Sequence, residues 1–128
     1  MIKLLLVAVG GAVGSVARYQ VGALTGRLLG LNWPYGTFTV NLTGGLLMGL
    51  LVGWLAQRSG AEQEQWRVLL GVGALGGFTT FSAFSLEVAL MIEKRAYAQA
   101  FTYTTASVIL SVAAVFAGMI LARRMFSA

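Results

Sequence analysis

Residues 76–85 read GGFTTFSAFS and lie in the middle of an otherwise apolar segment, residues 68–92. Two adjacent glycines and four hydroxyl side chains are unusual in such a segment. In hydrocarbon every backbone N–H and C=O group needs a partner. A segment that weakens a membrane helix at mid-depth is therefore tolerated only where it is buried in protein or lines a water-filled cavity. The segment predicts a membrane helix with a polar occupant near its centre.

The composition of the whole chain also indicates a membrane protein. Of its 128 residues, 58% are hydrophobic and 10% are charged, whereas a soluble domain has about 25% charged residues. Cysteine and histidine are absent, which excludes disulfides, thiolate metal sites, imidazole catalysis and histidine switching. We therefore expect a membrane protein that is not an enzyme.

Four apolar segments are long enough to cross a hydrocarbon core of about 30 Å. They predict an all-α protein with one domain, residues 1–128, and spans at residues 4–26, 35–56, 68–92 and 98–121. Aromatic side chains typical of the membrane interface fall at the ends of these spans: Trp33, Tyr35, Trp54, Trp66 and Tyr97. The start of the chain also resembles a signal peptide with a cleavage site at residues 15–17. Helix-compatible apolar sequence continues to residue 29, which favours a first span instead.

The basic residues lie at the ends of the spans and not in a stripe with interleaved aromatic residues, so they do not indicate a nucleic-acid partner. We interpret them as topology signals and as anchors to the lipid bilayer. The side with both termini and the second link carries five: Lys3, Arg58, Arg67, Arg123 and Arg124. The other side carries three, Arg27, Lys94 and Arg95, or four if Arg18 reaches it. Counting alone leaves two alternatives open, a single orientation or insertion both ways with antiparallel pairing.

Glycines recur at four-residue spacing at residues 45, 49 and 53, and again at residues 10 and 14. Such small faces let the backbones of membrane helices approach closely. The pattern predicts helix contacts, either between chains or within one chain.

Three polar side chains inside the spans are candidates for function, and each has a structural alternative. Arg18 is a positive charge at the mouth of a water-filled vestibule, or it snorkels to the interface. Asn41 offers amide donors to a ligand, or it forms a hydrogen bond between helices. Glu87 carries protons, donates as a neutral acid, or forms an ion pair with Arg18.

Two periodic sets suggest a path for a small ion. Tyr103, Ser107 and Ser111 follow at four-residue spacing and place three hydroxyls on one side of a helix; bonding to the preceding turn is the alternative. Phe81 and Phe84 share a face after the glycines. Packing is the usual role of phenylalanine, yet a ring is positive at its edge, so two rings presented edge-on form a weak anion site. A polar track beside such rings suits a small hard anion.

Three ordered motifs resemble the Fluc (CrcB) fluoride channels: GGAVGSVARY at residues 10–19, GTFTVNLTG at residues 36–44 and GGFTTFSAFS at residues 76–85. The resemblance covers nearly the whole chain. It implies an antiparallel dual-topology homodimer with two fluoride pores and a third helix that is broken at its centre. It also implies a structural Na⁺ held on the dimer axis by the backbone carbonyls of Gly76 and Thr79, and no organic cofactor.

The same resemblance implies roles for individual residues. Those matching the fluoride pathway are Asn41, Phe81, Ser82, Phe84, Tyr103, Ser107 and Ser111. Those matching the vestibule and the pore ends are Arg18, Thr37 and Glu87. The sequence departs from the family at Ala83, where threonine is frequent, and at Val115, where some members have a hydroxyl. Both departures bear on the extent of the polar track.

The expected function is passive export of F⁻ through the plasma membrane, in bacteria the inner membrane, which protects the cell from fluoride. The main rival is a small proton-coupled multidrug or cation exporter. Such a transporter needs an acid in its binding chamber, usually in the first helix, and here that helix has Arg18 and no acid. Glu87 is the remaining candidate, so proton coupling that is lost in Glu87→Gln would favour the exporter. A non-transporting scaffold protein is the second rival, and passive flux through purified protein would eliminate it.

Overall fold

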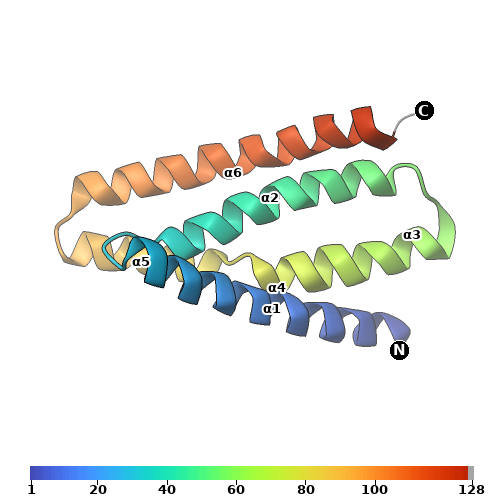
Figure 1. Ribbon diagram of the computed structural model, residues 1–128, viewed down its shortest axis with the longest axis horizontal. Coiled ribbons are helices and arrows are strands. Elements are labelled where there is room, and N and C mark those ends of the chain that lie inside the picture. The colour runs from blue at the N-terminus through green and yellow to red at the C-terminus, as the bar shows by residue number, and fades with distance from the viewer. Residues whose placement is uncertain (127–128) are drawn as a thin grey trace.

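The computed structural model describes residues 1–126, and these residues form an all-helical chain. Its elements are α1 (Ile2–Leu29), α2 (Tyr35–Leu55), α3 (Gly60–Trp66), η1 (Arg67–Leu75), α4 (Gly76–Phe78), α5 (Phe81–Glu93) and α6 (Tyr97–Phe126). The start of α1, the end of α6 and the α2–α3 link lie at one end, and the α1–α2 and α5–α6 links lie at the other (Figure 1). We call these the terminal end and the link end.

Four helical runs are long and apolar enough to cross a membrane, which confirms the predicted all-α fold with four spans. They are α1, α2, the combined run Gly60–Glu93 and α6. Several extend past the spans expected from hydropathy, because a helix continues where its polar residues reach the headgroup region. The largest difference is in the second link: residues 60–67, expected as part of the link, are helical and lead directly into the third span.

The glycine pattern is explained by contacts within the chain. A Cβ added at Gly49 would lie 2.1 Å from the carbonyl oxygen of Val115, and one added at Gly118 would lie 2.2 Å from that of Leu46. At Gly14 it would lie 1.9 Å from the carbonyl oxygen of Ala74. Only glycine permits such close backbone approach. The two small faces therefore join α2 to α6 and α1 to the third span.

The third span breaks where the hydroxyls follow the glycines. After α3, the segment η1 is π-helical, and α4 adds one short turn before the helix ends. Thr79 and Thr80 are extended, with φ and ψ of −89° and 161° and of −151° and 122°. The helix restarts at Phe81, and the Thr80 hydroxyl caps it by accepting a hydrogen bond from the Ala83 amide at 3.1 Å. The predicted break near the centre of the span is confirmed.

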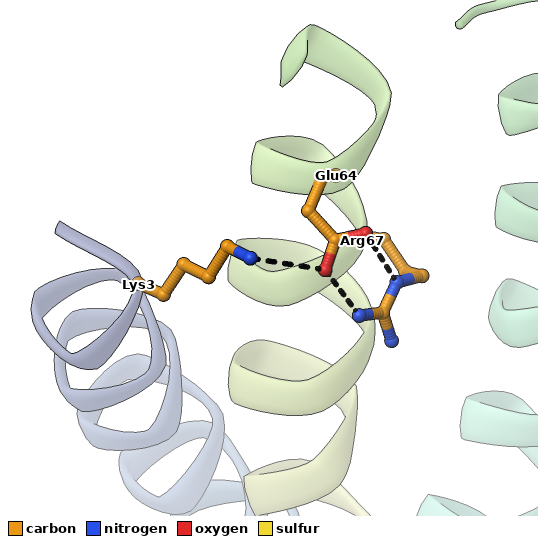
Figure 2. A network of polar contacts seen from close by, with 3 residues as sticks. All are labelled: Lys3, Glu64 and Arg67. Atoms are coloured by element: carbon orange, nitrogen blue, oxygen red, sulfur yellow. Dashed lines mark hydrogen bonds and ion pairs between the residues drawn. The ribbon is translucent and has the colours of Figure 1, made fainter. Parts of the chain in front are cut away.

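At the terminal end, ion pairs connect α1 to α3 and the start of η1. Figure 2 shows Lys3 at the start of α1 reaching Glu64 of α3, with 3.8 Å between Nζ and Oε1, while Arg67 binds both oxygens of the same carboxylate. These side chains are exposed to solvent, so their contribution to stability is small. Their effect is local: they tie the start of the first span to the start of the third.

Candidate ion pathway

Asn41 of α2 forms hydrogen bonds with the backbone at the break of the third span. Its Nδ2 donates to the Thr80 carbonyl oxygen at 3.0 Å, and its Oδ1 accepts from the Thr80 amide at 2.8 Å. One side-chain amide thus satisfies both backbone groups of a residue that has left the helix, as a membrane interior requires. An amide NH₂ has two hydrogens, so Asn41 retains one donor after binding Thr80.

Arg18 of α1 also binds the break. Its Nε donates to the Gly77 carbonyl oxygen at 3.0 Å, so the guanidinium lies at the break and does not snorkel away from it. The ion pairs of residues 1–126 do not include Arg18 with Glu87. A cavity of about 540 Å³, here the Arg18 cavity, lies beside it between α1, α2 and the break. It is lined by Ser15, Arg18, Tyr19, Gly22, Ala23, Gly36, Thr37, Val40, Thr80 and Ala83.

The break releases the carbonyls of Gly76 and Thr79, the two groups to which the family resemblance assigns sodium binding. In a continuous helix the Gly76 oxygen would accept from the Thr80 amide, and the Thr79 oxygen from the Ala83 amide. Here the Thr80 amide donates to Asn41 and the Ala83 amide donates to the Thr80 hydroxyl. Both carbonyl oxygens are thereby freed from the helix, and such neutral hard oxygens suit a hard cation. The donor set fits Na⁺.

Most of the predicted pathway residues meet in one groove between α2, the break and α6, with a volume of about 420 Å³. We call it the α6 groove. It is lined by Asn41, Gly44, Gly45, Met48, Thr79, Thr80, Phe81, Phe84, Ser107, Val108, Ser111, Val112 and Val115. Ser107 is 6% exposed, and its hydroxyl has no hydrogen-bond partner within residues 1–126. A buried, unbonded hydroxyl in a groove is suited to a ligand that accepts hydrogen bonds.

The two phenylalanines occupy very different environments. Phe84 is 8% exposed and packs against Tyr103, whereas Phe81 is 77% exposed. Their ring centroids are 5.6 Å apart, with 43° between the planes. Both rings line the groove, and the Phe81 ring also projects outward from the surface of the single chain.

Tyr103 and Glu87 form a separate site on the link-end side of the groove. The Tyr103 hydroxyl donates to Glu87 Oε1 at 2.8 Å, and the Thr37 hydroxyl donates to Oε2 at 2.8 Å. Tyr103 is fully buried and does not line the α6 groove with Ser107 and Ser111. The Tyr103 hydroxyl therefore binds Glu87, while Ser107 and Ser111 face the groove. Ser82 also lies outside the groove lining, with its Oγ 3.3 Å from Thr80 Oγ1.

Trp33, which the sequence indicated only as an interfacial aromatic, packs beside Tyr103. Its ring lies edge-on to Tyr103 with centroids 5.0 Å apart, and edge-on to Phe38 at 5.0 Å. It packs against the small core that includes Phe84 and Tyr103. No local motif signals this contact, because Trp33 and Tyr103 are brought together only by the fold.

These features define a class, a small multi-pass membrane protein with a polar path beside a broken helix. The chain belongs to the CrcB family, because the model of that family, described as CrcB-like protein, Camphor Resistance (CrcB), matches residues 5–119. A fluoride-specific ion channel FluC from Caulobacter sp. (strain K31) is 80% identical over 127 residues, covering 99% of each chain. A FluC from Phenylobacterium zucineum (strain HLK1) is 68% identical, covering 99% of this chain and all of its own. The resemblance inferred from the three motifs is confirmed.

Proposed function

We propose that this protein is a fluoride-specific ion channel that carries F⁻ passively out of the cell. Relatives at 80% and 67% identity over 127 residues are named fluoride-specific ion channels. The observation in this chain that carries the proposal is the α6 groove. It places the Asn41 amide, the Phe81 and Phe84 rings and the buried Ser107 hydroxyl around one space.

Each group replaces part of the water shell of a small anion. Asn41 supplies its remaining N–H, Ser107 supplies an O–H with no other partner, and the phenylalanines supply positive ring edges. Closely spaced donors in a narrow path favour F⁻ over the larger Cl⁻. The membrane potential drives the anion outward with about 2.3 kcal/mol per charge for each 100 mV, so no nucleotide is required.

The channel acts as an antiparallel homodimer with two pores. Phe81 is consistent with this assembly, because its ring lines the open groove and is 77% exposed, so a second chain can pack against it there. The small excess of basic residues at the terminal end, five against three, is a weak orientation signal and leaves insertion in both orientations possible. A second copy of the chain is thus the partner that closes each pore.

A structural Na⁺ on the dimer axis holds the two broken helices together through the Gly76 and Thr79 carbonyls. Asn41 and the Thr80 hydroxyl support it by occupying the amides that would otherwise bond these oxygens. Replacing Na⁺ with N-methylglucamine during purification is expected to lower dimer stability, and readdition of Na⁺ is expected to restore it. Dimers with identical thermal stability in both buffers, after exhaustive removal of sodium, would contradict the ion's role.

The proton-coupled exporter is less well supported. Within the described chain, α1 carries no acid, and both oxygens of Glu87 already accept hydroxyl hydrogen bonds.

The decisive assay is fluoride efflux from proteoliposomes containing purified protein, with a potassium ionophore as voltage shunt and chloride as the comparison anion. We expect fluoride efflux without a proton gradient and much slower chloride efflux. Equal fluxes would refute selectivity, and no fluoride flux from folded dimer would refute the channel.

A further inference from the structure

A groove of about 450 Å³ lies between α2, η1 and the last turn of α6, near the terminal end of the molecule. We call it the terminal groove. Its lining is apolar apart from one indole N–H: Leu47, Leu50, Leu51, Trp54, Leu70, Ala74, Leu75, Met125 and Phe126. None of these residues lines the Arg18 cavity or the α6 groove, so the terminal groove is a separate space outside the ion pathway.

The terminal groove extends from the membrane interface toward the bilayer centre. Trp54 lies one residue before the end of α2, and a tryptophan at the end of a span is typical of the headgroup level. Leu47 lies two turns deeper, about 10 Å along the helix at 1.5 Å per residue. Leu47 and Met125 are exposed in the single chain, so the groove is open along its side. Its depth and opening suit the first part of a phospholipid acyl chain.

Two arginines that form no ion pair within residues 1–126 lie at the mouth of the groove. Arg123 is three residues before Phe126 and lies beside it on the helix, and Arg124 directly precedes Met125. Both arginines are exposed. A guanidinium presents its donors in a planar fork that binds a phosphate through two hydrogen bonds. The mouth therefore carries two charges that suit a phosphate ester.

Arg58 holds the aromatic wall of the same mouth in place. Its Cζ lies 4.0 Å from the centre of the Trp54 ring, and the Trp66 ring lies edge-on to Trp54 with centroids 5.7 Å apart. Arg58 Nη1 forms an ion pair with Glu62 at 3.0 Å, so this guanidinium adds little net charge. The excess positive charge at the groove mouth thus comes from Arg123 and Arg124.

Charge favours a lipid over a second copy of the chain as the occupant. In the antiparallel assembly proposed above, a neighbouring copy would bring its link end to the level of the terminal groove. The link end carries Arg27, Lys94 and Arg95 beside the acid Glu93. Its net positive charge would repel the two arginines at the groove mouth, whereas the phosphate of an anionic lipid neutralises them.

We propose that the terminal groove binds one anionic phospholipid, with an acyl chain beside Leu47 and the phosphate on Arg123 and Arg124. A zwitterionic lipid carries an amine close to its phosphate and therefore gains less from the two guanidinium groups. Binding at this site does not require fluoride conduction, because the groove shares no lining residue with the ion pathway.

Native mass spectrometry of the purified protein in detergent tests the site. The protein is titrated with phosphatidylglycerol and, separately, with phosphatidylethanolamine that has the same acyl chains, and bound lipid is counted per subunit. Leu47→Trp fills the inner part of the groove. Val52→Trp is its control, because Val52 lies outside the groove lining on the same helix and is similarly exposed, 45% against 41% for Leu47.

A second pair of variants tests the charge. Arg123→Gln with Arg124→Gln removes both guanidinium groups from the groove mouth. Lys94→Gln with Arg95→Gln is the control, because it removes two adjacent exposed charges at the link end.

We expect the unaltered chain to bind one phosphatidylglycerol per subunit at least fivefold more tightly than phosphatidylethanolamine. Leu47→Trp and the double arginine variant are each expected to weaken this binding at least fivefold, while both controls bind as the unaltered chain does. If Leu47→Trp yields no folded protein, Leu70→Trp, also in the groove lining, is measured in its place.

Equal affinity of the unaltered chain for the two lipids overturns the proposal, and so does equal weakening in either control. Undiminished lipid binding in Leu47→Trp also overturns it. If that variant in addition loses its dimer, the occupant of the groove is a second copy of the chain and not a lipid.

Discussion

At the residue scale, Asn41 binds the Thr80 backbone and is proposed to donate its remaining N–H to fluoride. Two substitutions test these roles. Asn41→Ala removes both hydrogen bonds to Thr80. Each backbone group left without a partner costs about 1–3 kcal/mol, so we expect a lower Tm of the purified protein and at least tenfold slower fluoride efflux. Asn41→Asp keeps an acceptor for the Thr80 amide but places an anionic oxygen near the Thr80 carbonyl and in the groove. We expect it to abolish efflux.

Thr43→Ala is the matched control for Asn41, because Thr43 is an exposed polar residue two positions along the same helix. It is expected to leave both Tm and efflux unchanged. If Asn41→Ala conducts at the parental rate, the amide is neither a fluoride donor nor needed to shape the break.

Substitutions of the two phenylalanines distinguish an effect on conduction from an effect on folding. Phe84 is 8% exposed, so Phe84→Ala empties part of the core, at a cost of about 3–5 kcal/mol for a buried phenylalanine. Phe81 is 77% exposed, so Phe81→Ile is expected to leave the fold of the subunit intact while it slows fluoride efflux at least tenfold. Thermal unfolding and efflux are measured on the same preparations. A Phe81→Ile protein that conducts normally would remove this ring from the pathway.

At the scale of elements, the contact between α2 and α6 depends on glycine. Gly49→Ala would place its Cβ 2.1 Å from the Val115 carbonyl oxygen, which is backbone and cannot move aside without separating the helices. We expect little folded protein in detergent, measured by size-exclusion chromatography. Gly11→Ala is the control, since its Cβ would lie 4.0 Å from the Gly73 carbonyl oxygen. Equal yields of both variants would show that α2 and α6 are not held by this approach.

The elements were largely predictable, and the exceptions have physical reasons. Hydropathy locates four spans, and the glycines at residues 76 and 77 locate the break. The extended residues proved to be Thr79 and Thr80, because Asn41 binds the backbone there and the Thr80 hydroxyl starts the next helix. Hydropathy could not show that residues 60–67 are helical, since polar residues at a span end fit a helix or a loop equally well.

The candidate site was predictable as a set of residues but not as a set of contacts. Spacing alone placed Tyr103 in line with Ser107 and Ser111, yet the Tyr103 hydroxyl turns to Glu87. Similarly, Arg18 and Glu87 were candidates for an ion pair, but they bind Gly77 and two hydroxyls instead. Helical periodicity gives the face of a side chain and not the partner that another helix brings to it.

At the scale of the whole molecule, the distribution of Lys and Arg between the two ends decides how the chain is oriented in the membrane. Because Arg18 binds the break and does not reach the link end, the terminal end carries five basic residues and the link end carries three. Three of the four acidic residues pair with basic residues at the terminal end or lie inside a span: Glu62, Glu64 and Glu87. Orientation follows Lys and Arg and depends little on acidic residues, so small changes in the basic count should redirect insertion.

Two opposed variants therefore test the antiparallel dimer. Arg123→Ala with Arg124→Ala and Leu29→Lys changes the count from five and three to three and four, whereas Arg27→Ala with Arg95→Asn changes it to five and one. We expect each variant alone to insert in one orientation, measured by protease access to a C-terminal tag, and to lose fluoride efflux. Co-expression supplies both orientations and is expected to restore efflux at matched expression. If either variant conducts normally while inserted in one orientation, the working assembly is parallel or monomeric.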